Sequence, residues 1–169
     1  MPPTGPSGDA GDAPHFRRRA HGLCFSSPRP LPTWRADTGA GGTPGSAVDV
    51  QLHFAPQSDG VREDDVPWRP VVSSPHLDAA GRPLVRVDES PDGARRRFSY
   101  HDGAVFHVDR GGRHAWLDWP ASMSLPSAWP YFTGPVLTWL LRLHGRVVLH
   151  AASVVIDGGA VLIAGPSGA

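Results

Sequence analysis

The chain has 169 residues, of which 40% are hydrophobic, so it is long enough for one compact domain or for one domain and the start of another. Its 16 basic and 16 acidic side chains balance, and the charge gives no reason to expect a nucleic acid or an anionic membrane as a partner. Every basic residue is Arg, because the sequence contains no Lys. The single Cys24 excludes an internal disulfide and a site built from several thiolates, and it suits a reducing compartment.

The sequence predicts a cytoplasmic protein without a membrane span. The N-terminus is rich in Gly, Pro and Asp and lacks the apolar run of a signal peptide. The most apolar helical stretch, 136–143, contains Arg142 and is far shorter than the roughly 20 residues that cross a bilayer.

The N-terminal half predicts a leader followed by short strands. Residues 1–20 have little to bury and predict a disordered leader. The apolar run 21–26 predicts a first strand, and the strict alternation of apolar and polar residues in 48–54 predicts a half-buried second one. Residues 55–80 lack a period and contain several Pro, so we expect a long irregular connection there.

The next segment predicts a meander of antiparallel strands. Residues 83–87 give one short strand. The runs 96–101 and 104–109 are joined by Asp102-Gly103, a pair that suits a tight hairpin turn with positive φ. Gly111-Gly112 then turns the chain into a further strand at 114–119. Residues 21–126 are therefore expected to form a β-rich region.

One helix is clear from its period. Val136, Trp139, Leu140 and Leu143 follow the i, i+3, i+4, i+7 spacing of a face that packs on a sheet. Thr133 is a candidate N-cap, and Gly145 is a candidate for the end of the helix, which can begin as early as Trp129.

The last residues predict a hairpin that leads into a glycine-rich turn. Two apolar runs, 147–156 and 160–164, flank Asp157-Gly158-Gly159. The second run continues into Gly165-Pro166-Ser167-Gly168-Ala169, which supplies the first five positions of a phosphate-binding loop. Such glycines let successive N–H groups point at a phosphate. The tetrapeptide Gly-Pro-Ser-Gly is weak evidence of a phosphate-binding loop on its own. The same tetrapeptide occurs at Gly5-Pro-Ser-Gly8, where no strand is expected before it.

The stretch from Tyr131 to Ala169 resembles the HPr kinase-like P-loop proteins, and more narrowly their short members found near peptide-modification genes. In those proteins a helix ending in Arg-Gly precedes Leu-His-Ala-Ser-Ala-Val, a hairpin and the loop Gly-Pro-Ser-Gly-x-Gly-Lys-Ser. Here Leu149-His150-Ala-Ala-Ser-Val154 matches the middle element, and 22–32 matches the opening strand more loosely. The resemblance implies an ATP-dependent kinase, with Mg²⁺, that acts on a Ser hydroxyl of a protein or peptide.

The resemblance also implies a fold and a set of site residues. The expected fold is α+β, a mostly antiparallel sheet with one main helix, in which residues 127–169 begin a P-loop kinase domain. Gly165, Pro166, Ser167, Gly168 and Ala169 would bind phosphate through backbone N–H groups, and His150 would lie near the site; the other interpretation of His150 is a core histidine on a buried strand. The loop Lys, the Ser or Thr that holds Mg²⁺ and the later acidic residues are missing, so we expect no kinase activity from this chain alone. Its last strand would expose an unpaired edge, which predicts poor solubility.

The sequence also carries residues that suit two other functions. Strands carrying His101, His107, Asp109 and His114 could bring metal ligands to one face, but the close ligand spacing of a zinc site is missing. Trp116, Trp119 and Trp129 could line a groove for a peptide, which would make the chain a non-catalytic β-rich binding module with a vestigial loop; core packing is the simpler use of these side chains.

Overall fold

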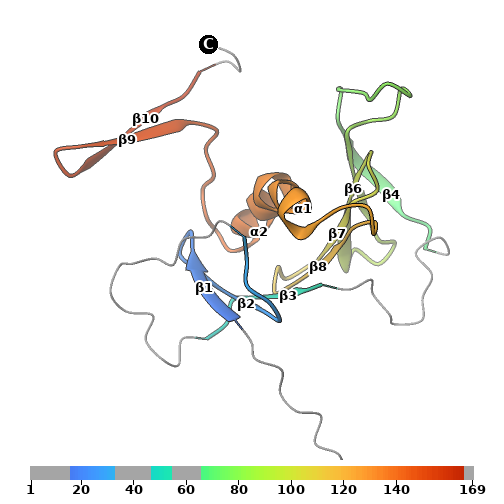
Figure 1. The fold of residues 1–169 in the computed structure, drawn as a ribbon, viewed down its shortest axis with the longest axis horizontal. Helices are drawn as coiled ribbons and strands as arrows, with labels where there is room; N and C mark the ends of the chain where they lie inside the picture. Colours follow the sequence, from blue (N-terminus) through green and yellow to red (C-terminus); the bar gives the residue numbers. More distant parts are fainter. Residues whose placement is uncertain (1–15, 33–46, 55–65, 166–169) are drawn as a thin grey trace, which may run out of the picture.

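The computed structural model describes residues 16–32, 47–54 and 66–165. These residues form an eight-stranded sheet with helices packed on one face, and a separate two-stranded hairpin at the C-terminal side (Figure 1). The α+β class and the mostly antiparallel sheet are confirmed. None of the helices in this part of the chain has both the length and the apolar character needed to cross a lipid bilayer.

The large sheet has the order β1-β2-β3-β8-β7-β6-β5-β4. Its strands are β1 (Phe16–Ala20), β2 (Leu23–Ser27), β3 (Val50–His53), β4 (Arg69–Ser73), β5 (Val85–Glu89), β6 (Arg95–Tyr100), β7 (Val105–Asp109) and β8 (His114–Asp118). The run from β4 to β8 is an antiparallel meander, as the sequence predicts for most of it. By contrast, β3 pairs in parallel with both β2 and β8.

The predicted turn of the meander is present. Gly103 has a φ of 94° and lies between β6 and β7, where Tyr100 N–H bonds to the carbonyl of Ala104 at 2.9 Å. A residue with a Cβ is strained at that φ, so the Asp-Gly pair fixes the hairpin and its register, in which Phe98 lies opposite Phe106. Both Phe side chains are buried on the helix side of the sheet.

The helical segment begins earlier than the sequence predicts. It consists of α1 (Leu125–Tyr131), a π-helical turn η2 (Phe132–Val136) and α2 (Leu137–Leu143). Ser124 is the N-cap, since its hydroxyl accepts a 3.3 Å hydrogen bond from Ser127 N. The cap predicted at Thr133 is therefore wrong; its hydroxyl instead bonds back to the carbonyl of Trp129 at 3.2 Å. Gly134 leaves the helical region just before Pro135, which has no N–H to donate.

The predicted end of the helix at Gly145 is confirmed. Gly145 has a φ of 70°. Its N–H donates to the carbonyl of Arg142 at 3.0 Å, and the N–H of Arg146 donates to the carbonyl of Leu141 at 2.8 Å. This pair of bonds is the Schellman ending, in which a left-handed glycine lets the last carbonyls find donors.

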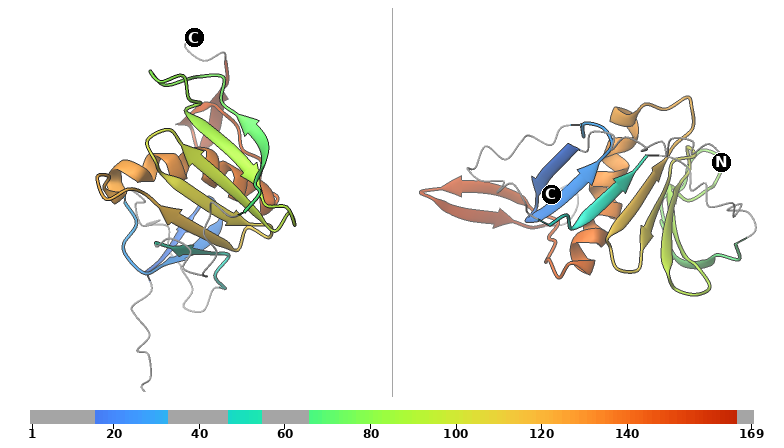
Figure 2. Two further views of the ribbon diagram at one scale, coloured as in Figure 1. Left: turned by 90° about the vertical axis from the view of Figure 1, so that its right-hand side faces the viewer. Right: turned by 90° about the horizontal axis from the view of Figure 1, so that it is seen from below.

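The core lies between the helices and one face of the sheet, as two further views show (Figure 2). Sheet residues such as Phe25, Leu52 and Phe106 pack there with Phe132 and Leu140 of the helices. The helices therefore share one core with the β-rich region, and the boundary expected at residue 127 does not separate two cores within the described residues. The predicted helix face is rotated from the observed one: the helical side chains that are buried in η2 and α2 are Phe132, Val136, Leu137, Leu140 and Leu141.

Two strands were not predicted. The leader expected through residue 20 is wrong for Phe16–Ala20, which forms edge strand β1 against β2; residues 1–15 lie outside the described residues. The irregular connection expected over 55–80 is wrong for Arg69–Ser73, which forms edge strand β4 with a register shift between Pro70 and Val72. Prolines and irregularities are tolerated at the edge of a sheet, where one side of the strand needs no ladder partner.

Candidate functional site

The predicted hairpin after the helix is confirmed. It consists of β9 (Ala152–Ile156) and β10 (Gly159–Ile163), paired antiparallel with Val154 opposite Val161. Asp157 and Gly158 form the two-residue turn with φ values of 50° and 78°. Positive φ at both central residues is the type I′ geometry that matches the twist of hairpin strands.

Strand β10 leads directly into the candidate phosphate-binding residues. Ile163 ends the strand and Gly165 follows two residues later. Gly165 is exposed, at the end of the described chain. Pro166, Ser167, Gly168 and Ala169, which were predicted to complete this half of the loop, lie outside the described residues.

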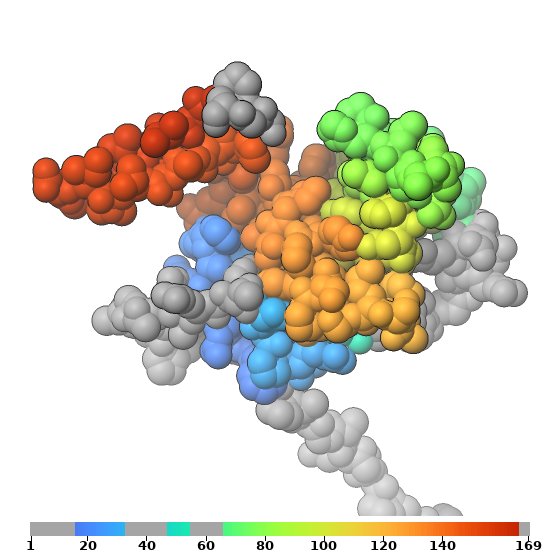
Figure 3. Space-filling view, turned by 45° about the horizontal axis from the view of Figure 1, so that its top comes forward, coloured from blue at the N-terminus to red at the C-terminus, as the bar shows by residue number. Residues whose placement is uncertain are grey.

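The hairpin is exposed on both faces. Every residue of β9 and β10 is exposed, although most are apolar, and Val155 has 74% of its surface accessible. The space-filling view shows the hairpin, in red, projecting from the rest of the molecule (Figure 3). Successive apolar residues point to opposite faces of a strand, so this pattern is typical of a strand that is covered on both sides in an α/β sheet.

His150 lies in the segment between α2 and β9, outside any strand, and is exposed. The interpretation of His150 as a core histidine on a buried strand is therefore wrong. Its position near the phosphate-binding residues stays a prediction. Its segment does line a pocket of about 400 Å³, in which Val147, Val148 and Leu149 face Leu137 and Leu141 of α2.

The metal hypothesis finds no support. Across residues 16–32, 47–54 and 66–165, no three His, Cys, Asp or Glu side chains are grouped so that they could hold a metal ion. His107 is buried in β7, and His101 lies in the turn after β6. His114 contacts another histidine, with its Nδ1 atom 3.1 Å from Nε2 of His53.

The three Trp side chains do not form one groove. Trp129 is buried in the core and stacks on Phe132 with ring centroids 4.9 Å apart. Trp116 stacks on His53 at 5.2 Å. It alternates along β8 with buried core residues, so it lies on the sheet face away from the helices. Trp119 packs edge-on against Phe54 at 6.0 Å. A peptide groove made by these three Trp residues is therefore excluded.

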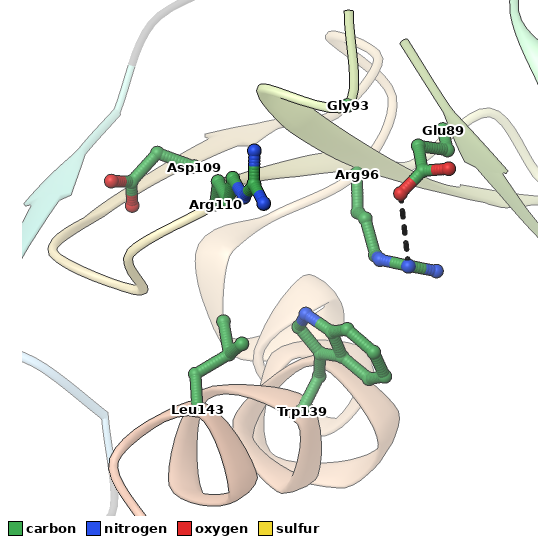
Figure 4. A pocket seen from close by; sticks show the side chains of 7 residues that line it. All are labelled: Glu89, Gly93, Arg96, Asp109, Arg110, Trp139 and Leu143. Carbon is green, nitrogen blue, oxygen red and sulfur yellow. Dashed lines mark hydrogen bonds and ion pairs between the residues drawn. The ribbon is translucent and has the colours of Figure 1, made fainter.

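A second concave site was not predicted. We call it the α2 pocket; it has a volume of about 310 Å³ and is lined by Glu89, Gly93, Arg96, Asp109, Arg110, Trp139 and Leu143 (Figure 4). Trp139 and Leu143 were predicted for the core face of the helix. In the structure Trp139 is half-buried and Leu143 is 38% exposed, and both form the floor of this pocket.

The alternation of β6 could have indicated which side chains reach this pocket. In the run Arg95-Arg96-Arg97, neighbouring side chains point to opposite faces of the sheet. The guanidinium of Arg96 lies 4.4 Å above the ring of Trp139 on the helix side. Those of Arg95 and Arg97 lie above Trp116 and Trp68 instead. The pairing of Arg96 with the helix depends on tertiary packing, which no local pattern predicts.

The chain was compared with protein-family models, with curated proteins and with solved structures, and none of them matches it. The resemblance to the HPr kinase-like proteins thus stays a prediction that depends on the residues quoted for it.

Proposed function

We propose that this chain supplies the β-rich region and the strand before the phosphate-binding loop of an HPr kinase-like serine kinase, which transfers phosphate from ATP, with Mg²⁺, to a hydroxyl of a cytoplasmic protein or peptide. The observation that carries the proposal is the exposed hairpin. An apolar strand, β10, ends two residues before Gly165, and a phosphate-binding loop requires this order of buried strand and glycine turn.

The apolar faces of the hairpin support the proposal. An isolated two-stranded hairpin is marginally stable in water. Val154 and Val161 pair across it, and Val155 and Leu162 are exposed as well. Burial of such side chains contributes about 1.5–3 kcal/mol each. A hairpin of this composition is suited to a sheet with helices on both faces, which is the environment of the strand before a phosphate-binding loop.

The residues of this chain fit only part of a nucleotide site. Gly165 and the residues after it would donate backbone N–H groups to phosphate. The sequence has no Lys for the β- and γ-phosphates. Phosphoryl transfer depends on this charge, so we assign phosphate contacts to this chain and no catalytic step.

The test starts from the gene. The reading frame is sequenced beyond the codon for Ala169, and Gly-Lys-Ser or Gly-Lys-Thr directly after it is expected. ATP binding to the protein made from that frame is then measured by calorimetry with Mg²⁺. The substitution Gly165→Val should weaken ATP binding by about tenfold or more. A side chain at this position prevents the turn from pointing its backbone N–H groups at the phosphate, so charge-assisted hydrogen bonds are lost.

The leader offers a matched control. Gly5 begins the same tetrapeptide, Gly5-Pro-Ser-Gly8, but no apolar run precedes it in the sequence, so Gly5→Val should leave ATP binding unchanged. Equal losses in both variants would contradict a specific role for Gly165. A stop codon after Ala169 would overturn the kinase proposal and leave the non-catalytic binding module, which a peptide pull-down with the same chain would then test.

A further inference from the structure

The α2 pocket lies where the ends of three strands meet the last turns of a helix. Glu89 ends β5, Arg96 is in β6, and Asp109 ends β7, while Trp139 and Leu143 project from α2 (Figure 4). Its volume of about 310 Å³ is at the lower end of the range of about 300–1,000 Å³ for small-molecule sites. Any ligand that fits it must therefore be compact.

Three of the four carboxylate oxygens that line the pocket already accept a hydrogen bond. Glu89 accepts from Arg96 Nη2 at 3.0 Å and from Arg69 Nη2 at 3.4 Å. Asp109 Oδ1 accepts from the backbone N–H of His114 at 2.7 Å. Figure 4 shows the Asp109 carboxylate pointing away from Arg110 and from the helix. A ligand that brings donors would thus have to compete with existing bonds.

Two donor groups of the pocket have no hydrogen-bond partner among the described residues. No residue in the described part of the chain accepts a hydrogen bond from the guanidinium of Arg110 or from Trp139 Nε1. Figure 4 shows the indole nitrogen on the edge of the Trp139 ring that faces the pocket. Arg96 is held in place by Glu89 on one side and by the Trp139 ring, 4.4 Å away, on the other. The free N–H groups that line the pocket therefore favour a ligand with hydrogen-bond acceptors.

The charges of the lining limit how negative that group is. The lining contains two Arg and two carboxylates. Arg96 pairs with Glu89, with side chains 24% and 27% exposed, and the Asp109 carboxylate points away from Arg110 (Figure 4). Among the described residues, Arg110 is therefore the cation of the lining that has no ion-pair partner. A carboxylate carries one negative charge and matches a single guanidinium. A phosphate ester carries about 1.5–2 negative charges at neutral pH, which this lining does not compensate.

We propose that the α2 pocket binds a carboxylate on a compact apolar body. Arg110 donates a charge-assisted pair of hydrogen bonds to the carboxylate, and Trp139 Nε1 donates one more. The apolar body packs on Leu143 and the exposed part of the Trp139 ring. Arg96 positions Trp139 rather than binding the ligand. This proposal does not depend on the kinase proposal, because none of the residues after α2 lines the pocket.

The experiment titrates benzoate into the full chain and follows the indole N–H resonances by heteronuclear NMR. The six Trp residues give six such resonances, and Trp139→Phe assigns the one from Trp139 by its loss. We expect saturable movement of the Trp139 resonance toward lower field, as a hydrogen bond to an anion forms, with the resonance of buried Trp129 unmoved. Movement of all six together, or no movement of Trp139, would overturn the proposal.

A pair of Arg variants tests the assigned donor. Arg110→Gln should weaken benzoate binding by about tenfold or more, the usual effect of losing a charge-assisted hydrogen bond. Arg113→Gln removes another exposed Arg, which does not line the pocket, and should leave the affinity within about twofold. Equal affinities in both variants contradict the proposal. Inorganic phosphate binding more tightly than benzoate at the Trp139 resonance would also overturn it.

The source of the carboxylate is resolved by a second pair of probes. A short peptide that ends in phenylalanine with a free carboxylate is compared with the same peptide ended by an amide, both followed at the Trp139 resonance. Binding of the acid form, with loss of binding by the amide form, supports a peptide C-terminus as the ligand. Binding of benzoate with neither peptide supports a free organic acid, and both results retain the carboxylate site.

Discussion

The hydroxyl of Tyr131 donates a 2.5 Å hydrogen bond to Asp102 Oδ2, and this bond ties the end of α1 to the turn between β6 and β7. The ring of Tyr131 also stacks on that of Tyr100, with centroids 4.3 Å apart. In turn, the Tyr100 hydroxyl donates to the backbone carbonyl of Tyr131 at 3.1 Å. The two hydroxyl groups thus hold the helices against the sheet by donating hydrogen bonds, which they can do only while both are protonated.

These contacts predict that the protein loses stability in alkaline solution. The hydrogen bond to Asp102, followed by burial and the charge of Asp102, raises the pKa of Tyr131. Burial, with smaller contributions from Tyr131 and Asp102, raises the pKa of Tyr100. Unfolded tyrosines ionise near about pH 10, so above that pH the unfolded state releases protons that the folded state retains, and the free energy of unfolding falls. Denaturant titrations between neutral pH and pH 11 should show the decline.

Removing the phenols should flatten that pH profile. Tyr131→Phe should lower the free energy of unfolding by about 1 kcal/mol at neutral pH, a modest loss because the bond is partly solvated. In the double variant with Tyr100→Phe, the loss of stability above pH 10 should become shallower than in the parent chain. An unchanged slope in the double variant would show that other groups cause the alkaline loss.

A buried carboxylate predicts a larger effect. Asp88 has none of its surface exposed and accepts from Arg86 Nε at 3.0 Å and from Arg97 Nη2 at 2.9 Å. Asp88→Ala leaves Arg97, whose side chain is 14% exposed, without its counter-ion. We expect the free energy of unfolding to fall by about 3–5 kcal/mol, as it does when one partner of a buried ion pair is removed. Chemical denaturation measures this loss.

Asp118 is the control for Asp88. It lies in β8 of the same sheet and is half-buried, so Asp118→Ala tests the removal of a strand carboxylate without the buried ion pair. The expected loss is below about 1 kcal/mol. If the triple variant with Arg86→Met and Arg97→Met in the Asp88→Ala background stayed as unstable as Asp88→Ala alone, unpaired guanidinium groups would not be the cause.

Local chemistry explains which elements were predictable. The Asp102-Gly103 and Asp157-Gly158 turns fix both hairpins, because Gly103 in the first turn and both residues of the second adopt a positive φ that few residue types reach at low cost. Strand β3 was clear from its alternation. The edge strand β4 was missed because Pro70 and its register shift obscure any period. The start of α1 was missed because Pro126 and Pro130 are more typical of a loop, although Pro126 lies in the first helical turn, where proline is well tolerated.

Non-local pairing explains what was missed. The parallel contacts of β3 with β2 and β8 join residues that are far apart in the chain, such as Leu52 and Ala115, and nothing in either segment specifies them. The candidate loop could be proposed from the sequence because its pattern is local; it stays a prediction. The α2 pocket was missed because its residues come from three strands and a helix, and because Trp139 and Leu143 fit a core period equally well.

The exposed hairpin predicts self-association of this chain. Both of its strands have a free edge within the described sheet order, and its faces carry apolar side chains such as Leu162, which is 55% exposed. Strand edges of this kind pair with other chains. Val155→Lys with Leu162→Lys should therefore reduce the apparent mass in concentration-dependent light scattering, since charges on a strand oppose edge pairing.

Leu77 provides a matched position outside the hairpin. It is 57% exposed, similar to Leu162, and lies between β4 and β5. Leu77→Lys should leave association unchanged if the hairpin causes it. A parent chain that stays monomeric at high concentration would contradict the prediction directly.

The composition of the chain predicts that its 169 residues do not transfer phosphate on their own. Catalysis of phosphoryl transfer depends on cations that neutralise the developing charge, above all the loop Lys and Mg²⁺. This sequence contains no Lys. Incubation with radiolabelled ATP, Mg²⁺ and a mixture of Ser-containing peptides should give no transfer and no hydrolysis above a protein-free blank. Turnover by the purified chain that Gly165→Val abolishes would instead mean that arginines of this chain replace the missing Lys.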